Sequence, residues 1–201
     1  MQKNSLSTST QIYEFSERIT NLLRAEAWKV STAYDLQPIQ LQMLHYLSIC
    51  NRYSNTPIAV SDYFQITKGT VSQSLKVLEA RGYVEKRPNH KDGRSVHLCL
   101  SPTGAALLAH HWPPPLLHNA CQLLPDDGQE QIRQALQTLL SKLQEANRQQ
   151  RFGVCATCRY QQQAEENYRC GLTGEVLIPH EIELICREHE PHHNPIEAIP
   201  A

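Results

Sequence analysis

Four cysteines in the last quarter of the chain have the residue type and spacing for metal chemistry. They are Cys155, Cys158, Cys170 and Cys186, in the pattern C-x2-C-x11-C-x15-C. A C-x2-C pair can place two thiolates on one metal, and two further cysteines complete a four-sulfur shell. The pattern therefore predicts one metal centre, with His189 as a spare ligand.

The identity of this centre stays open at the level of sequence. Structural zinc is common, but zinc ribbons usually pair two C-x2-C knuckles, whereas Cys170 and Cys186 are single. One C-x2-C plus two lone cysteines also suits an iron–sulfur cluster. Unligated thiols or a redox disulfide pair form the third alternative. Because residues 151–190 are too few for a sizeable core, a bound metal or cluster would supply folding free energy.

The remaining composition indicates a cytoplasmic protein. The 201 residues contain no apolar run long enough to span a bilayer, and the N-terminus lacks the apolar core of a secretory signal. Seven cysteines in that compartment favour thiols or metal ligands over a disulfide framework. Cys50, Cys99 and Cys121 stand alone in apolar surroundings, where we expect them to be buried as small hydrophobes.

The charge of the chain is unevenly distributed. The formal net charge is −1, yet the segment from Thr67 to Arg94 carries seven Lys and Arg against three acids, a local charge of +4. A basic patch on a nearly neutral protein indicates nucleic-acid binding better than a high overall pI does. A solvated charged surface is the alternative explanation.

The same region has the element order of a winged helix-turn-helix. After predicted helices near 10–34 and 39–49, Thr56-Pro57 begins a short helix, residues 65–67 make a tight turn, and Lys68-Gly69 opens a second helix that Gly82 ends. Strand-like runs at 83–87 and 95–100 flank a loop with hairpin-type residues. The second helix buries a stripe at positions 71, 75 and 78.

The outward residues of the second helix and the hairpin have the chemistry of DNA contacts. A helix in the major groove needs small or polar hydrogen-bonding side chains, and a basic wing reaches phosphates or the minor groove. The candidate DNA-binding residues are Lys68, Thr70, Ser72, Gln73, Lys76, Lys86, Arg87, His90, Lys91 and Arg94.

The elements after the hairpin are helical as far as residue 149. Ser101-Pro102 begins a helix that the prolines at 113–115 must interrupt. Residues 128–149 form an amphipathic helix with Ile132, Leu136 and Leu143 on its apolar face. We expect the tail, 191–201, to be disordered.

These motifs resemble the MarR (multiple antibiotic resistance regulator) family. The resemblance runs through Leu36-Gln37-Pro38 to Leu47, through Ile66 to Val84, and through Asp92-Gly93-Arg94 to Leu100-Ser101-Pro102-Thr103-Gly104. It covers residues 36–104 strongly and the flanking helices loosely. It does not extend to the cysteines.

The resemblance implies a homodimer with interlocked terminal helices and two DNA-binding lobes. Arg94 would enter the minor groove, and Asp92 would support the wing. Two features depart from the family pattern. Gln65 takes a turn position that is usually Gly, so we expect a positive φ there. The prolines at 113–115 break what is normally one long dimerisation helix, which leaves the dimer geometry open.

The sequence thus predicts a mainly α fold with a small β-hairpin wing. The expected parts are an N-terminal dimerisation helix (1–35), a winged helix-turn-helix (36–104), C-terminal dimerisation helices (105–150), a four-cysteine metal-binding module (151–190) and a tail (191–201). The predicted function is a non-enzymatic regulator that binds double-stranded DNA as a dimer, with no membrane partner, controlled by redox state or metal. The alternative is an iron–sulfur electron-transfer protein whose winged helix serves protein contacts only. No small-molecule effector is identified.

Overall fold

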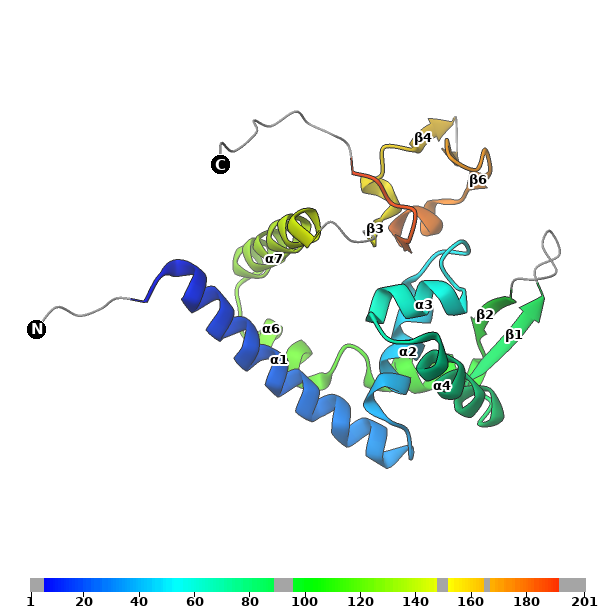
Figure 1. Ribbon diagram of the computed structural model, residues 1–201. Coiled ribbons are helices and arrows are strands. Elements are labelled where there is room, and N and C mark those ends of the chain that lie inside the picture. Colours follow the sequence, from blue (N-terminus) through cyan, green and yellow to red (C-terminus); the bar gives the residue numbers. More distant parts are fainter. Residues whose placement is uncertain (1–5, 89–95, 148–151, 165–166, 192–201) are drawn as a thin grey trace, which may run out of the picture.

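The computed structural model describes residues 6–88, 96–147, 152–164 and 167–191. Helices dominate as far as residue 147, and short strands follow (Figure 1). None of the described helices combines the length and apolar character needed to cross a bilayer. The predicted tail (191–201) falls, apart from Pro191, outside the described residues.

Four helices and a hairpin form the central unit. The helices are α1 (Thr8–Ala33), α2 (Pro38–Ile49), α3 (Pro57–Phe64) and α4 (Lys68–Ala80), and the strands are β1 (Val84–Pro88) and β2 (Val96–Leu100). The strands pair antiparallel with Val84 opposite Leu100. The core between them contains Leu41, Leu44, Leu75, Leu78 and Leu98, each at most 2% exposed. This is the helix-turn-helix with a wing that the sequence predicts.

Local sequence signals set the limits of α3 and the turn after it. Thr56 Oγ1 accepts a hydrogen bond from Ala59 N at 3.2 Å, which caps the start of α3 ahead of Pro57. Gln65 ends the helix with φ of 52°, as expected for a turn position that usually takes glycine. The Ser61 hydroxyl donates to the Ile66 carbonyl at 2.6 Å and closes the turn.

The helix after the wing begins at a close backbone approach. α5 (Pro102–His111) is capped by Ser101, whose Oγ accepts from Gly104 N at 3.0 Å. A Cβ on Gly104 would lie 2.3 Å from the Tyr83 carbonyl oxygen, so only glycine fits there. The prolines do interrupt the helix, because α6 starts anew at Pro115 (Pro115–Gln122) after a cis Trp112–Pro113 bond.

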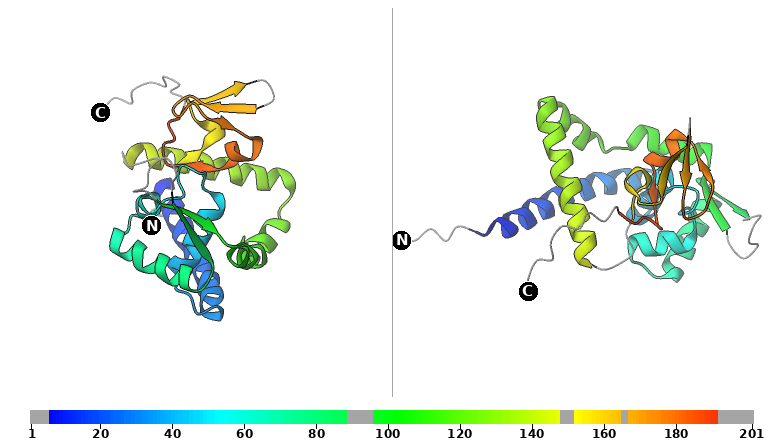
Figure 2. Two further views of the ribbon diagram at one scale, coloured as in Figure 1. Left: turned by 90° about the vertical axis from the view of Figure 1, so that its right-hand side faces the viewer. Right: turned by 90° about the horizontal axis from the view of Figure 1, so that it is seen from above.

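Two long helices leave large apolar side chains in solvent. The N-terminal part of α1 and the whole of α7 (Asp126–Asn147) extend away from the central unit (Figure 2). Exposed on them are Phe15, Ile19 and Trp28 of α1 and Leu136 and Leu143 of α7, each 52–60% accessible. In one chain these faces have little to pack against.

The C-terminal residues form small antiparallel sheets. β3 (Gly153–Val154) pairs with β7 (Ile185–Cys186), and β4 (Gln161–Ala164), β5 (Asn167–Cys170) and β6 (Val176–Leu177) make a three-stranded sheet in that order. Two 3-10 turns complete it, η1 (Cys155–Thr157) and η2 (Pro179–Glu183). We call residues 152–191 the cysteine segment. It lies beside α3 and the loop before it (Figures 1 and 2).

Candidate functional site

Helix α4 presents a polar face to solvent. Thr67 Oγ1 accepts from Thr70 N at 3.1 Å and caps its first turn, and Gly82 ends it with φ of 71°. Its apolar side, with Val71, Leu75 and Leu78, is buried in the core. The five candidate DNA-binding residues on α4 are all exposed: Lys68, Thr70, Ser72, Gln73 and Lys76.

The first turn of α4 and the wing border one hollow. Lys68, Ser72 and Lys86 line a depression of about 160 Å³ together with Pro57 and Ile58 at the start of α3. Neither Lys68 nor Lys76 forms an ion pair with any described residue. The structure thus brings predicted contacts from α4 and from β1 to the same face.

The wing strand carries partly neutralised cations. Lys86 Nζ lies 2.5 Å from Glu79 Oε2, and Arg87 Nη2 lies 3.0 Å from Glu85 Oε2. Lys86 and Arg87 are both exposed, as expected for phosphate contacts. The predicted tip residues are not placed, since His90, Lys91, Asp92 and Arg94 lie outside the described residues.

Comparison with known proteins identifies this architecture. Residues 34–95 match the model of the MarR family. This segment is therefore similar to a MarR-type winged helix, and the chain has a MarR-like winged-helix fold. No curated protein matches the sequence.

Solved MarR-type structures share the fold. The MepR–DNA complex of S. aureus has 21% identity and a TM-score of 0.53, and the match covers 69% of this chain and 99% of that one. FabT of Streptococcus pneumoniae in complex with DNA has 23% identity, a TM-score of 0.55, and 69% and 99% coverage. A MarR regulator of Methanosarcina mazei Go1 has 21% identity, a TM-score of 0.55, and 68% and 99% coverage.

A second hollow lies beside the winged helix, between α1 and α2. It measures about 390 Å³ and is lined by Trp28, Leu36 and Ile39, among others. The sequence pattern did not single out these positions, because apolar residues at helix ends are expected in a hydrophobic core as readily as in the wall of a pocket.

The four clustered cysteines line one cavity. Cys155, Cys158, Cys170 and Cys186 come from η1, its C-cap, the end of β5 and the end of β7, and they border a space of about 120 Å³. Within the described ranges, however, no three His, Cys, Asp or Glu side chains are arranged to hold a metal ion. The structure brings the predicted ligands together without making a single-ion site.

Tight turns aim these cysteines inward. Cys158 N donates to the Cys155 carbonyl at 3.0 Å, which closes the C-x2-C turn. After Cys170 the chain reverses, with Gly174 N donating to the Cys170 carbonyl at 2.7 Å and Cys170 N donating to the Glu175 carbonyl at 2.9 Å. Gly174 has φ of 73°, a conformation that favours glycine.

The thiols share an apolar environment. Burial, with smaller contributions from the neighbouring Cys186, Cys158 and Cys170, raises the pKa of the Cys155 thiol to about 11. Burial also raises the pKa of Cys186, while hydrogen bonds from the Asn51 side chain and the Glu188 backbone oppose that shift.

His189, the predicted spare ligand, is placed elsewhere. Its Nε2 lies 2.9 Å from Thr157 Oγ1. Its ring packs against the backbone of Gly153, where an added Cβ would lie 2.4 Å from His189 Nδ1. His189 is not among the described side chains that line the cysteine cavity.

The other cysteines are less uniformly buried than predicted. Cys50 is buried in the core, but Cys99 and Cys121 are only partly buried. The sequence offers no signal for this difference, since all three have apolar neighbours.

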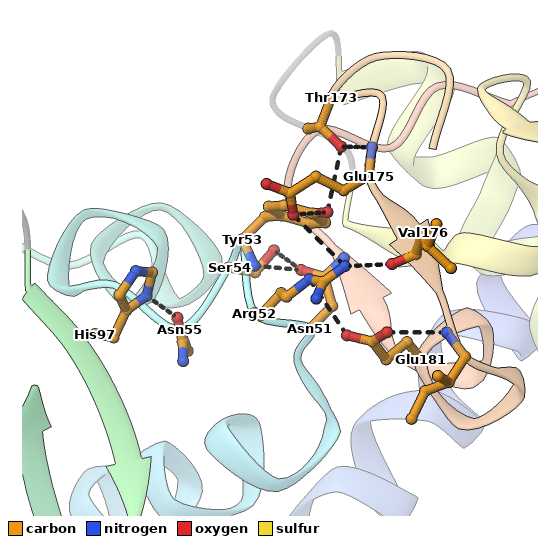
Figure 3. Close-up of polar contacts among 11 residues, drawn as sticks. Asn51, Arg52, Tyr53, Ser54, Asn55, His97, Thr173, Glu175, Val176 and Glu181 are labelled. Atoms are coloured by element: carbon orange, nitrogen blue, oxygen red, sulfur yellow. Dashed lines mark hydrogen bonds and ion pairs between the residues drawn. The ribbon is translucent and has the colours of Figure 1, made fainter. Parts of the chain in front are cut away.

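The loop between α2 and α3, residues 50–56, joins the cysteine segment to the winged helix (Figure 3). On one side Asn51 N donates to the Ile185 carbonyl at 2.9 Å, and Arg187 N donates to Ser54 Oγ at 2.8 Å. On the other side Leu98 N of β2 donates to the Asn55 carbonyl at 2.7 Å. One short loop therefore contacts both the cysteine strands and the wing.

Charged and aromatic contacts reinforce this docking. Arg187 Nε and Nη2 each lie 2.8 Å from Asp62 Oδ2 on α3. Arg52 Nη2 donates to the Val176 carbonyl at 2.6 Å, and Tyr53 Oη donates to Glu175 Oε2 at 2.8 Å (Figure 3). The sequence analysis did not single out these residues. Their partners lie more than 120 positions away, and no periodicity encodes such pairs.

Proposed function

We propose that this chain is a MarR-type transcriptional regulator that binds double-stranded DNA through α4 and the wing. The observation that carries the proposal is the polar outer face of α4, continuous with a basic hollow that includes β1. Side chains of this kind hydrogen-bond to base edges in the major groove and to phosphates. The MepR and FabT complexes, which share the fold, contain DNA.

The proposed binding unit is a homodimer. The exposed apolar faces of α1 and α7 would be buried between two copies, as the family resemblance implies. A two-fold dimer reads two half-sites about one helical turn apart, so the operator should be a pseudo-palindrome. The predicted dimer would also hold both copies of α4 at a fixed spacing.

The test separates base reading from phosphate contact. DNA selected from a random library by the full-length protein gives the operator. Gln73→Ala should change the preferred base at one position per half-site, while Lys76→Ala should weaken all sequences alike and lower the salt dependence. Lys29→Ala, a matched exposed lysine on α1, is the control.

The proposed role of Arg94 in the wing depends on its charge and on the planar hydrogen-bonding geometry of its guanidinium. Arg94→Ala should reduce operator affinity by roughly 1–3 kcal/mol, and Arg94→Lys should restore only part of it. Failure of the parent protein to select any DNA motif at near-physiological salt would refute DNA binding. Unchanged affinity of Arg94→Ala would refute only the role of the wing.

We further propose that the cysteine segment controls DNA binding by metal or redox state. Its route would be the α2–α3 loop, since that loop contacts both β7 and β2. An allosteric coupling of about 1–3 kcal/mol is the usual size. A quadruple Cys→Ser protein that binds operator like the parent in reducing and oxidising buffer would refute control.

A further inference from the structure

The cavity that the four clustered cysteines help to line is much larger than one ion. The cavity that they line measures about 120 Å³. A single water molecule needs roughly 10–15 Å³ of such space. The cysteines therefore border a volume that would take a group of many atoms.

A single zinc ion requires a different arrangement. Zn–S bonds of about 2.3 Å in a tetrahedron put the four sulfurs only about 3.8 Å apart, which leaves no further space between them. The described side chains offer no group of three that could hold one ion, although all four thiols face the same cavity. The shared cavity and the lack of a single-ion site are both explained if the sulfurs bind the outside of a larger inorganic group.

We propose that this cavity binds an iron–sulfur cluster, ligated by Cys155, Cys158, Cys170 and Cys186. Four cysteine thiolates are the usual ligand set of both the two-iron and the four-iron clusters. Iron and sulfide would occupy the cavity, and the thiolates would bind the irons, two to each iron of a two-iron cluster or one to each iron of a four-iron cluster. The proposal concerns the cavity alone, so it stands or fails independently of DNA binding.

The walls of the cavity suit such a group. Leu172, Leu177 and Tyr160 supply apolar and aromatic surface around the thiols. The Asn51 side chain and the Glu188 backbone hydrogen-bond to the Cys186 thiol. Low solvent access and hydrogen bonds to the ligating sulfurs are the features by which proteins hold and tune clusters.

One of these hydrogen bonds comes from the winged helix. Asn51 is buried, and its Oδ1 accepts from Ser54 Oγ at 2.8 Å and from Tyr53 N at 3.2 Å. Those contacts hold the Asn51 amide so that it faces Cys186. The cluster would thus sit at the junction of the two regions, and its sulfur shell would include a donor from each.

The first experiment uses the parent protein. Full-length chain purified without oxygen, or metal-free chain incubated with ferric iron, sulfide and a thiol that reduces part of the iron to the ferrous state, should contain about equal iron and acid-labile sulfide, roughly two or four per chain. It should also gain broad visible absorption. Ferrous iron alone and zinc alone are the matched controls, and neither should give that spectrum.

Two results would overturn the proposal. One is a colourless protein that holds one zinc per chain and takes up no sulfide under any of these conditions. The other is a protein that retains neither metal nor sulfide after reconstitution, which would show free thiols. Because the parent chain is used, loss of folding in a variant cannot obscure either result.

Variants then assign the ligands. Any single Cys→Ser change at 155, 158, 170 or 186 should remove most of the bound iron and sulfide. Cys99→Ser and Cys121→Ser, at partly buried positions outside the cavity, should retain the parental content. Circular dichroism checks that each variant keeps its helices. A folded Cys170→Ser protein with the iron, sulfide and spectrum of the parent would refute the four-cysteine ligand set.

Discussion

The winged helix and the cysteine segment are stabilised in different ways. In the winged helix, large side chains from α2, α4 and β2 fill a shared core, with Met43, Leu44 and Leu78 fully buried. Among the described residues of the cysteine segment, Leu177 is the one large aliphatic side chain that is fully buried, while Leu172 and Ile178 are more than half exposed. One region thus has a hydrophobic core, and the other has almost none.

This difference implies that the cysteine segment depends on contacts beyond its own few buried side chains. Burying one leucine contributes about 1.5–3 kcal/mol, whereas ordering each residue of backbone costs about 1–2 kcal/mol. The segment must therefore draw stability from docking on the winged helix, and the cluster proposed above would add to it. Phe152 illustrates the docking, because its ring joins the winged-helix core beside Tyr46 and Tyr63.

The largest expected effect tests whether the two regions unfold separately. Leu44→Ala should destabilise the winged helix by about 2–5 kcal/mol, through lost burial and the cavity left behind. Leu177→Ala, equally buried, should loosen only the cysteine segment. Urea unfolding monitored by hydrogen exchange at individual amides distinguishes unfolding of the winged helix from loosening of the cysteine segment. If Leu177→Ala lowers protection in α4 as much as in β5, the regions form one cooperative unit.

A second prediction concerns the Arg187–Asp62 contact that holds the regions together. Arg187→Ala removes two short contacts to a half-buried carboxylate, so docking should weaken by about 1–3 kcal/mol. Faster exchange of the Asn51 amide, which donates to Ile185, reports the loss. Arg187→Lys should restore only part, because lysine lacks the planar fork. Equal protection of the Asn51 amide in the parent and both variants would show that Phe152 and the strand contacts are enough to hold the cysteine segment on the winged helix.

The sequence predicts features that depend on neighbouring residues, and it does not predict contacts between residues far apart in the chain. Helix α4 was predictable because its cap at Thr67, its apolar stripe and Gly82 are all local signals. The meeting of the four cysteines at one cavity was predictable from ligand spacing. The roles of Asn51 and Arg187 were not, since each acts on a residue more than 120 positions away. Nor does spacing alone fix the distance between thiols, on which the identity of a bound group depends.

A third prediction tests the winged helix alone through pH. Burial lowers the pKa of His45, which stacks on Trp112 with 4.2 Å between ring centroids, to about 4. In the unfolded chain the pKa of His45 is near 6.5, so the unfolded state takes up the proton first as pH falls. The contribution of neutral His45 to folding stability is therefore fully present above pH 6.5 and is lost as pH falls towards 4. His45→Gln should unfold with a shallower dependence between pH 7 and 5.

Solvent screening limits how much the pKa shift of His45 can change folding stability. A shift of this extent corresponds to at most about 3 kcal/mol, and roughly 1–2 kcal/mol is expected because the ring is partly exposed. His118→Gln, on the exposed face of α6, is the matched control. Denaturation curves that lose stability in parallel for His45→Gln and the parent would contradict the prediction.

The smallest effect should come from Arg52, which joins the same two regions from a more exposed position. Its guanidinium lies 3.3 Å from Glu181 and 3.5 Å from Glu175, with 44% of the side chain accessible. Exposed ion pairs contribute about 0.2–1 kcal/mol and weaken with salt. Arg52→Ala should therefore change Asn51 exchange far less than Arg187→Ala does, and the gap should widen at high salt. If Arg52→Ala has the larger effect, then its hydrogen bond to the Val176 carbonyl, and not the contact with Asp62, holds the cysteine segment on the winged helix.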